Sequence, residues 1–317
     1  MLYDSLWRNE LMINKTTMII DKQNGDVCFN DSDHVYWNQV NGNKYMSVTT
    51  LIHRYVQPFD DFFWSGFKAL ERLLPKDIWQ IEKKRFLSIK KIDLDILNQY
   101  DITTDAFNHE QQAILDEWDK KKKEACERGT KMHEEIEQSF YKQGKNTSCE
   151  HFGLGGKFEC RKDYTPLDLE YGVYPEYLVY RDSPDGILHI AGQIDLLIKQ
   201  GNDIILADHK SSGKIDLKSH FNTQTKQSQK MLYPLNNLDD CNYSHYSLQL
   251  STYAWMLQKI NPKFVIKDLI INHYDHNGNN TLYHCNYLKK EVERMLYHYK
   301  RELILEQERE KRKRVEY

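Results

Sequence analysis

Apolar runs of strand length dominate the middle of the chain. They lie at 172–180, 188–198 and 203–209, and each is rich in Val, Ile, Leu or Tyr. The turns between them, Ser183–Gly186 and Lys199–Asn202, contain the Gly, Pro, Ser, Asp and Asn residues that favour chain reversal. Apolar runs of this length, bounded by turn residues, predict three consecutive antiparallel strands.

Two further hairpins are predicted outside this region. One lies within 26–48, where alternating runs flank Asn41-Gly42, two residues that tolerate positive φ. The other joins 264–273 to 281–287 through a polar turn at 277–279. The first hairpin would precede the central strands as an accessory element.

Helical periodicity marks most of the remaining chain. Between 60 and 141 the pattern is helical and charged, with breaks at Pro75 and 101–104. The predicted helices with the clearest patterns are Ala113–Phe140, His245–Lys259 and Leu288–Tyr317. The order of helix, three strands, helix, two strands and helix predicts an α/β fold.

Three segments carry weaker signals. A short helix is predicted over Leu51–Tyr55, with Ser47 or Thr49 as its cap. Gly144–Asp163 is polar and rich in Gly, which predicts a loop. Ser211–Ser244 is a long polar connection, and both a flap over a functional site and simple disorder are compatible with its composition.

The composition is that of a globular protein. Of 317 residues, 40% are hydrophobic and 29% are charged, and the net charge is −3, so nucleic-acid binding would need a local basic surface. No apolar stretch has the length of a membrane span and the start of the chain is interrupted by charges, so neither a transmembrane segment nor a signal peptide is expected. Six cysteines without a C-x-x-C pair argue against a zinc ribbon and a disulfide scaffold and predict a reducing, cytoplasmic location.

Charged residues interrupt the most apolar predicted strands. Asp208 and Lys210 are two residues apart on one strand, so they share a face, and Asp195 can reach that face from the neighbouring strand. Two converging carboxylates stay ionised when a cation lies between them, and oxygen ligands suit Mg²⁺ or Mn²⁺. Taken alone, the D-x-K pattern is more often a surface ion pair.

Three other positions have two interpretations each. His133 shares a helical stripe with Ala125 and Gly129, whose small size permits close packing, and a lone His there is more often a packed core residue than a ligand. Gln249 and Tyr253 are one helical turn apart. They can present an amide and a hydroxyl to one functional point, or they can cap a neighbouring strand.

From about residue 125 to 271 the chain resembles the PD-(D/E)XK nuclease superfamily. It is most similar to the RecB-like branch, which includes phage lambda-type and mitochondrial genome maintenance exonucleases. The motifs of that branch, in order, are a G-T-x-x-H helix, a Glu on the first core strand, a G-x-I-D strand, a D-x-K-[ST] strand end and a Q-x-x-x-Y helix. They are matched by Gly129–His133, Glu176, Gly192–Asp195, Asp208–Ser211 and Gln249–Tyr253. The segment Ser47–Thr49 also resembles one found in viral and mitochondrial members.

The resemblance implies a restriction-endonuclease-like fold, with a mixed sheet core flanked by helices. The core would occupy 111–317, after an N-terminal β-hairpin and helical accessory region at 1–110. Mg²⁺ or Mn²⁺ is the implied cofactor. Some relatives bind an iron–sulfur cluster through four cysteines, but Cys241 and Cys285 are isolated here, so no cluster is expected.

The resemblance also implies roles for individual residues. The implied catalytic residues are Asp195, Asp208, Lys210 and Glu176. The implied metal ligands are His133, Asp195, Asp208 and a main-chain carbonyl near His209. The implied substrate contacts are Gln249, Tyr253, Ser211 and Lys214. The metal would lower the pKa of an attacking water, and Lys210 would position that water or stabilise the transition state.

The expected function is a phage-type DNA exonuclease in recombination, repair or replication. It would act on single-stranded ends, away from membranes, in the cytoplasm of a bacterial host if phage-encoded, with recombination or replication proteins as possible partners. A structure-specific or restriction-like endonuclease of the same fold is a second hypothesis. The sequence leaves a ribonuclease open as well, since nothing in it indicates whether the 2′-hydroxyl is recognised. A non-catalytic nucleic-acid-binding subunit is a third, and the combination of His133, Asp195, Asp208 and Lys210 counts against it.

Overall fold

A computed structural model describes residues 20–162, 165–222 and 226–315. Its helices are α1 (Val48–His53), α2 (Asp61–Leu73), α3 (Lys76–Ile89), α4 (Leu94–Gln99), α5 (Thr104–Gln143), α6 (Asn242–Ile260) and α7 (Lys289–Val315). The long strands are β7 (Gly172–Asp182), β8 (His189–Gln200), β9 (Asp203–Ser211) and β12 (Val265–Tyr274). The shorter strands are β1 (Lys22–Asn24), β2 (Val27–Asn30), β3 (Val35–Asn38), β4 (Lys44–Ser47), β5 (Thr147–Cys149), β6 (Leu154–Phe158), β10 (Phe221–Asn222), β11 (Gln227–Ser228) and β13 (Asn280–His284). The first 19 residues, where a short helix or irregular lead-in and no signal peptide were expected, lie outside the described part.

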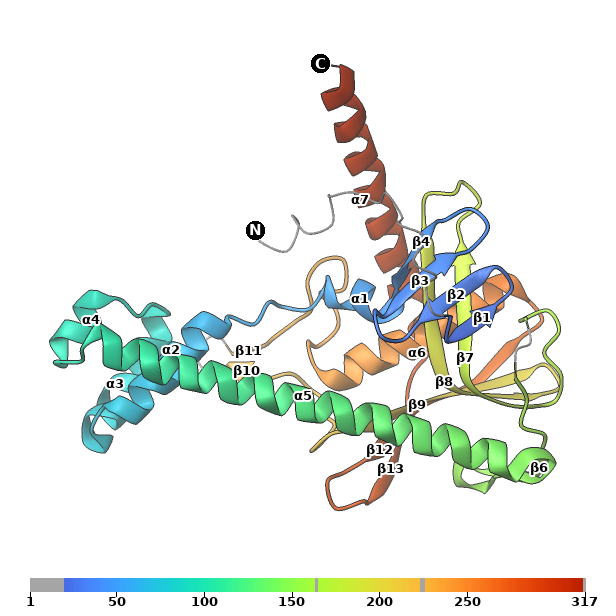
Figure 1. Ribbon diagram of the computed structural model, residues 1–317, viewed down its shortest axis with the longest axis horizontal. Helices are drawn as coiled ribbons and strands as arrows, with labels where there is room; N and C mark the ends of the chain where they lie inside the picture. Colours follow the sequence, from blue (N-terminus) through green and yellow to red (C-terminus); the bar gives the residue numbers. More distant parts are fainter. Residues whose placement is uncertain (1–19, 163–164, 223–225, 316–317) are drawn as a thin grey trace.

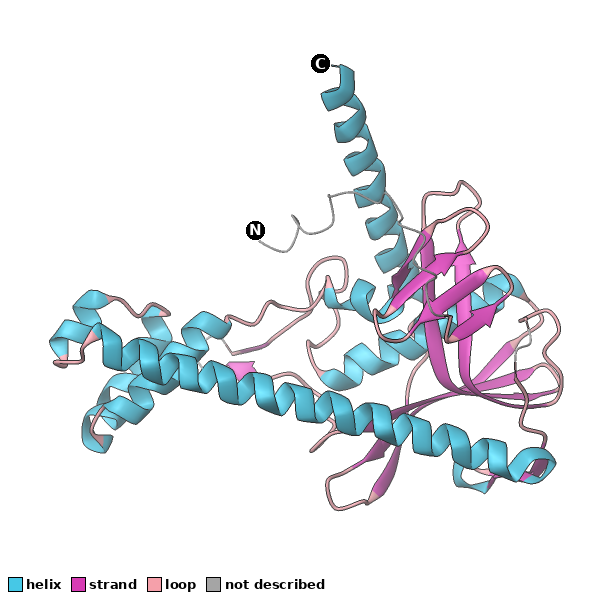
Figure 2. Cartoon of the chain, viewed as in Figure 1, coloured by secondary structure: helices cyan, strands magenta, loops and turns pink. Residues whose placement is uncertain are grey.

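A nine-stranded mixed sheet lies at one side of the molecule, on the right in Figure 2. Strands β7, β8 and β9 are antiparallel, as predicted, and β12 then pairs with β9 in parallel. A parallel pair needs a crossover connection, and α6 lies within it. Helices alternate with the strands of this mixed sheet along the chain, so the fold is α/β, which confirms the predicted class.

The N-terminal hairpin extends the same sheet. Strands β3 and β4 pair across the Asn41-Gly42 turn, where Gly42 has a φ of +75°, as the sequence predicts. Strand β4 pairs in parallel with β8, through Met46 and Ile190. The accessory hairpin is therefore continuous with the sheet that carries the central strands.

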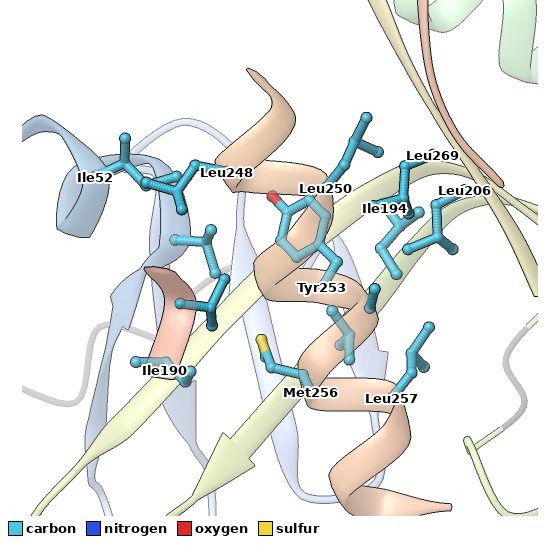
Figure 3. Packing of buried hydrophobic residues seen from close by; sticks show 14 of the residues in the cluster. Ile52, Ile190, Ile194, Leu206, Leu248, Leu250, Tyr253, Met256, Leu257 and Leu269 are labelled. Atoms are coloured by element: carbon cyan, nitrogen blue, oxygen red, sulfur yellow. The ribbon is translucent and has the colours of Figure 1, made fainter. Parts of the chain in front are cut away.

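Helices cover the two faces of the sheet differently. Residues of α1, α6 and α7 join one face in the largest apolar cluster, and Figure 3 shows Tyr253 and Leu257 of α6 close to Ile194 of β8 and Leu206 of β9. On the other face, Phe140 near the end of α5 packs with Leu196 and Ala207 in a second cluster. Tertiary burial on both faces explains why these strands read as nearly continuous apolar runs.

The predicted accessory helices form a core of their own. Helices α2, α3, α4 and the first part of α5 share one apolar cluster that includes Phe67, Trp79, Phe86 and Ile114. Helix α5, with 40 residues, then runs from this cluster to the sheet (Figure 1). It begins at Thr104 with the Thr103 side chain as its cap, nine residues before the predicted start. The boundary expected near residue 110 thus falls inside a continuous helix.

Two weakly predicted segments contain more ordered structure than their polar composition indicates. The predicted loop 144–163 contains the antiparallel pair β5–β6, because Thr147, Cys149 and Phe158 are buried against the sheet. The connection after Lys210 is anchored by Met231 and Leu235, which are buried in the main core, and its described part includes the short pair β10–β11. Polar composition concealed these few apolar anchors. No helix in the described part of the chain has the length and apolar character needed to cross a membrane.

The cap of α1 provides a test of local helix chemistry. The Ser47 hydroxyl accepts a hydrogen bond from the Thr50 N–H at 3.1 Å, so Ser47 and not Thr49 is the cap. Ser47→Ala is expected to lower the free energy of unfolding by about 1 kcal/mol, measured by urea denaturation. Thr49→Ala is the matched control, and an equal loss in both variants would contradict this assignment.

Candidate metal centre

Three neighbouring strands and one helix bring the predicted site residues together. Glu176 lies on β7, Asp195 on β8, and Asp208 and Lys210 on β9. The pairing of Pro175 with Leu196 and of Tyr177 with Ile194 places Glu176 directly opposite Asp195. His133 reaches the same place from α5.

His133, Glu176 and Asp195 form a compact cluster. Among the described residues, these three offer ligand atoms that all lie within 4.8 Å of one another. His133 Nδ1 is 3.0 Å from Glu176 Oε1 and 3.6 Å from Asp195 Oδ2. Its Nε2 is 3.1 Å from the main-chain carbonyl oxygen of His209. Helix α5 thus presents one imidazole to oxygen atoms from three strands.

The backbone at Glu176 is unusual for a strand. Its φ is +49°, in the left-handed region that residues other than Gly and Asn rarely adopt. The Glu176 carboxylate is held by His133 on one oxygen and accepts a hydrogen bond from Gln193 on the other. Strained backbone at a cluster of ionisable groups is typical of functional sites.

The electrostatics of the cluster call for positive charge. Burial lowers the pKa of His133, but Asp195 and Glu176 outweigh it and raise that pKa to about 9. Burial raises the pKa of Asp195, which is 8% exposed and accepts a hydrogen bond from the His209 N–H at 2.6 Å. A protonated His133 donates to oxygen on both of its ring nitrogens and supplies the positive charge.

The same atoms fit a divalent cation. One imidazole nitrogen and two carboxylate oxygens lie close enough together to hold one divalent cation, and a bound cation would replace the proton of His133 as the balancing charge. The His209 carbonyl oxygen lies at the other ring nitrogen, Nε2. Glu176, the weaker candidate from the sequence, belongs to this group. Asp208 does not, so its role as a ligand stays a prediction.

Asp208 is engaged by a different set of partners. Lys210 Nζ lies 2.8 Å from Asp208 Oδ2 and donates to Oδ1 at 2.9 Å, and Gln249 donates to the same Oδ1 at 3.0 Å. Burial raises the pKa of Asp208 to about 6. Burial lowers the pKa of Lys210, but Asp208 and Asp195 outweigh it and raise that pKa above its usual value, so the ammonium is charged.

Gln249 and Tyr253 form a buried support beneath Asp208. Gln249 donates to the Tyr253 hydroxyl at 3.3 Å as well as to Asp208, and the two side chains belong to residues that are 7% and 3% exposed. The Tyr253 ring lies so close to Gly192 that a Cβ there would be 2.5 Å from the ring. This contact joins the G-x-I-D and Q-x-x-x-Y motifs. Gln249 and Tyr253 are therefore positioning groups for Asp208.

The remaining predicted residues are more peripheral. Ser211 is exposed at the end of β9, and Lys214 is exposed and paired with Asp216 at 2.6 Å. Their substrate contacts stay predictions. The His209 side chain lies away from Asp208, with its Nδ1 2.9 Å from the Asn272 amide, and burial lowers its pKa to about 3. The backbone of His209 faces the cluster, since its N–H donates to Asp195 at 2.6 Å and its carbonyl oxygen lies 3.1 Å from His133 Nε2. The role of that carbonyl as a metal ligand stays a prediction.

The predicted close packing around the His133 stripe is wrong for its first residues. Ala125 is exposed, and a Cβ on Gly129 would meet nothing within 4 Å. Helix α5 contacts the sheet only toward its C-terminal end, because its earlier part leaves the sheet for the separate helical core.

Three residues near the site were not singled out by the sequence. Gln193 contacts Glu176, and the Lys22 ammonium of β1 lies 3.8 Å from the same carboxylate. The Tyr246 ring lies beneath the Lys210 ammonium, with 5.0 Å from Nζ to the ring centroid. Tyr246 could have been found from its three-residue helical spacing to Gln249. Lys22 carries no such local signal.

Comparison with known proteins adds little. No protein-family model and no curated protein matches the chain. The solved structures to which it is similar include that of a protein named SSO0001, with 15% sequence identity and a TM-score of 0.24. The similarity covers 39% of this chain and 50% of that one, so the chain matches half of that protein's length. Such a weak likeness shows neither a family nor a fold.

The contact between Gly192 and Tyr253 predicts a steric effect. Gly192→Ala is expected to destabilise the protein by about 1–3 kcal/mol, because the added methyl overlaps the ring. Gly155→Ala, on an exposed strand where a Cβ meets nothing within 4 Å, is the matched control. In a double-mutant cycle with Tyr253→Ala, the combined loss should be smaller than the sum of the single losses. Additive losses would contradict direct contact.

The proton on His133 predicts a pH dependence in a chelating buffer. A pKa raised from 6.5 to about 9 in the folded state means that the contribution of His133 to stability is complete below pH 6.5 and is lost as the pH rises through about 9. The free energy of unfolding should fall across this window by at most about 3 kcal/mol. His133→Gln should remove that part of the slope. An unchanged slope in this variant would contradict the assignment.

Proposed function

We propose that this chain is a divalent-metal-dependent nuclease of the PD-(D/E)XK type that hydrolyses phosphodiester bonds in DNA. The observation that carries the proposal is the convergence of His133, Glu176 and Asp195 beside the Asp208–Lys210 pair, on adjacent strands and one helix. Buried carboxylates beside a charged lysine suit a reaction in which negative charge develops on a phosphate. They have no evident use in a module that only binds nucleic acid.

In this proposal some residues of the site would hold a cation, and others would orient those ligands or stabilise negative charge on the phosphate. His133, Glu176 and Asp195 would hold Mg²⁺ or Mn²⁺, and the family resemblance adds the His209 carbonyl and Asp208 as further ligands. A cation there supplies positive charge beside the phosphodiester and promotes ionisation of an attacking water. Gln193 keeps Glu176 directed at His133, and Gln249 keeps Asp208 oriented.

Lys210 acts as a charged group in this scheme. Its pKa is raised by Asp208 and Asp195, so it holds its proton and is a poor general base. The ammonium lies between the Asp208 carboxylate and the face of the Tyr246 ring, which fix its position. From there it would stabilise negative charge that develops on the phosphate oxygens or orient the attacking water.

The choice of DNA as substrate and of cleavage from an end rests on the resemblance to lambda-type exonucleases. A role in recombination, repair or replication, with partners from those processes, belongs to the same proposal. The helical core at the far end of α5 stands apart from the sheet (Figure 1) and offers a separate surface for a strand or a partner protein.

The proposal predicts metal-dependent loss of linear DNA. Single- and double-stranded DNA labelled at either end, and a closed circle, would each be incubated with Mg²⁺, Mn²⁺ or EDTA. Asp195→Asn and Lys210→Ala are expected to lower kcat by about 100-fold or more, since the first removes a carboxylate that would hold the cation and the second removes the ammonium that would stabilise charge on the phosphate. Lys263→Ala, an exposed lysine in the turn before β12, is the control for charge loss.

The outcomes separate the hypotheses. Degradation of linear DNA alone supports an exonuclease, and the label that is lost first gives its polarity. Cleavage of the circle supports an endonuclease instead. DNA binding without cleavage under any metal condition would overturn the catalytic proposal.

A further inference from the structure

A cavity of about 590 Å³ adjoins the candidate metal centre. Its walls come from the first strand and flanking residues (20–25), from Glu137 and Tyr141 of α5, from Arg161 and Lys162, and from 174–178 of β7. Glu176 belongs both to this wall and to the cluster with His133 and Asp195. A molecule in the cavity would therefore lie directly beside the metal centre.

The N-terminal wall is fixed to the strand that carries Glu176. The Asn24 amide donates to the Leu178 carbonyl at 2.7 Å and lies 3.3 Å from the Tyr177 hydroxyl. Asn24 is 7% exposed, so these bonds are shielded from water. They hold β1 against β7 and place Lys22 next to Glu176.

Two lysines supply the cavity with cationic groups. The Lys22 ammonium is 3.4 Å from Glu137 Oε1 and 3.8 Å from Glu176 Oε2, a loose contact shared between two carboxylates. The Lys162 ammonium lies 3.8 Å above the centre of the Tyr141 ring. Within the described residues, no carboxylate lies within 4.0 Å of it. Arg161, by contrast, pairs with two glutamates of its own.

The acidic groups of the wall are turned to other partners. His133 and Gln193 direct Glu176 toward the cluster. Glu137 accepts a hydrogen bond from the Tyr141 hydroxyl at 3.1 Å, and Asp21 accepts one from a backbone N–H at 2.8 Å. A cation in the cluster would also neutralise Glu176. The groups left for a ligand are then mainly the two ammonium groups and neutral amides.

We propose that this cavity binds the stretch of nucleic-acid strand next to the bond that is cleaved, with Lys22 and Lys162 contacting its phosphates. The inference rests on the proposed nuclease function and adds a subsite to it. A strand whose phosphodiester lies at the metal centre must continue past it, and Glu176 lines both the cluster and the cavity. Its volume falls within the range of about 300–1,000 Å³ that is usual for small-ligand sites, enough for a short stretch of strand. Phosphates bound by lysine give a salt-dependent affinity.

The test compares a long single-stranded oligonucleotide with bis(4-nitrophenyl) phosphate, a diester too short to fill the cavity. Lys162→Ala is expected to raise the KM of the oligonucleotide several-fold more than that of the small diester. It should also lower the slope of log affinity against log salt by about 1, measured by fluorescence anisotropy in EDTA. Lys22→Ala should lower the slope likewise. Lys157→Ala, an exposed lysine outside the cavity wall, should leave both measurements unchanged.

Several results would overturn the proposal. Equal effects of Lys162→Ala on both substrates, or an unchanged salt slope, would show that its ammonium does not contact the strand. An equal effect of Lys157→Ala would show general attraction only. A mononucleotide that binds with the same Lys162 dependence as the oligonucleotide would make the cavity a nucleotide site. If the wild type cleaves neither substrate, the proposed nuclease function is wrong. The salt slope of oligonucleotide binding then still tests whether the cavity binds a nucleic-acid strand.

Discussion

Buried negative charge is the constraint on which this structure depends. Asp195 and Asp208 are 8% and 1% exposed, and Glu176 faces Asp195 across two paired strands. Burial raises the pKa of Asp195 and of Asp208, and nearby positive charge opposes this rise. His133 and Lys210 supply that charge from two sides, and a divalent cation would supply more.

The arrangement of elements follows from bringing charge to this point. Helix α5 carries His133, and its Phe140 anchors it to the same sheet face as Leu196. Helix α6 carries Gln249 to Asp208 from the opposite face, and the absence of a side chain at Gly192 lets the Tyr253 ring approach β8 closely enough to complete that link. The site thus lies where both faces of the sheet can contribute to it.

The long helix α5 belongs both to the helical core and to the region around the sheet. Its first part belongs to the apolar core shared with α2, α3 and α4, and its later part carries His133 and Glu137. Because α5 is continuous from Thr104 to Gln143, a single helix contributes both to the helical core and to the candidate metal centre. The first strand adds a second link, since Lys22 contacts both Glu137 of α5 and Glu176 of β7.

The sequence by itself determined the strands, their turns and the order of the site residues. Short apolar runs with acidic interruptions specify where β7, β8 and β9 lie, since alternation and turn chemistry are local properties. It could not show that β12 would pair with β9, that 144–163 would form a strand pair, or that α5 would leave the sheet before His133. Tertiary structure alone decided the orientation of Glu176, the separation of Asp208 from the cluster and the position of Lys22 beside Glu176. Those depend on contacts between residues far apart in the chain, where burial and close approach outweigh local preference.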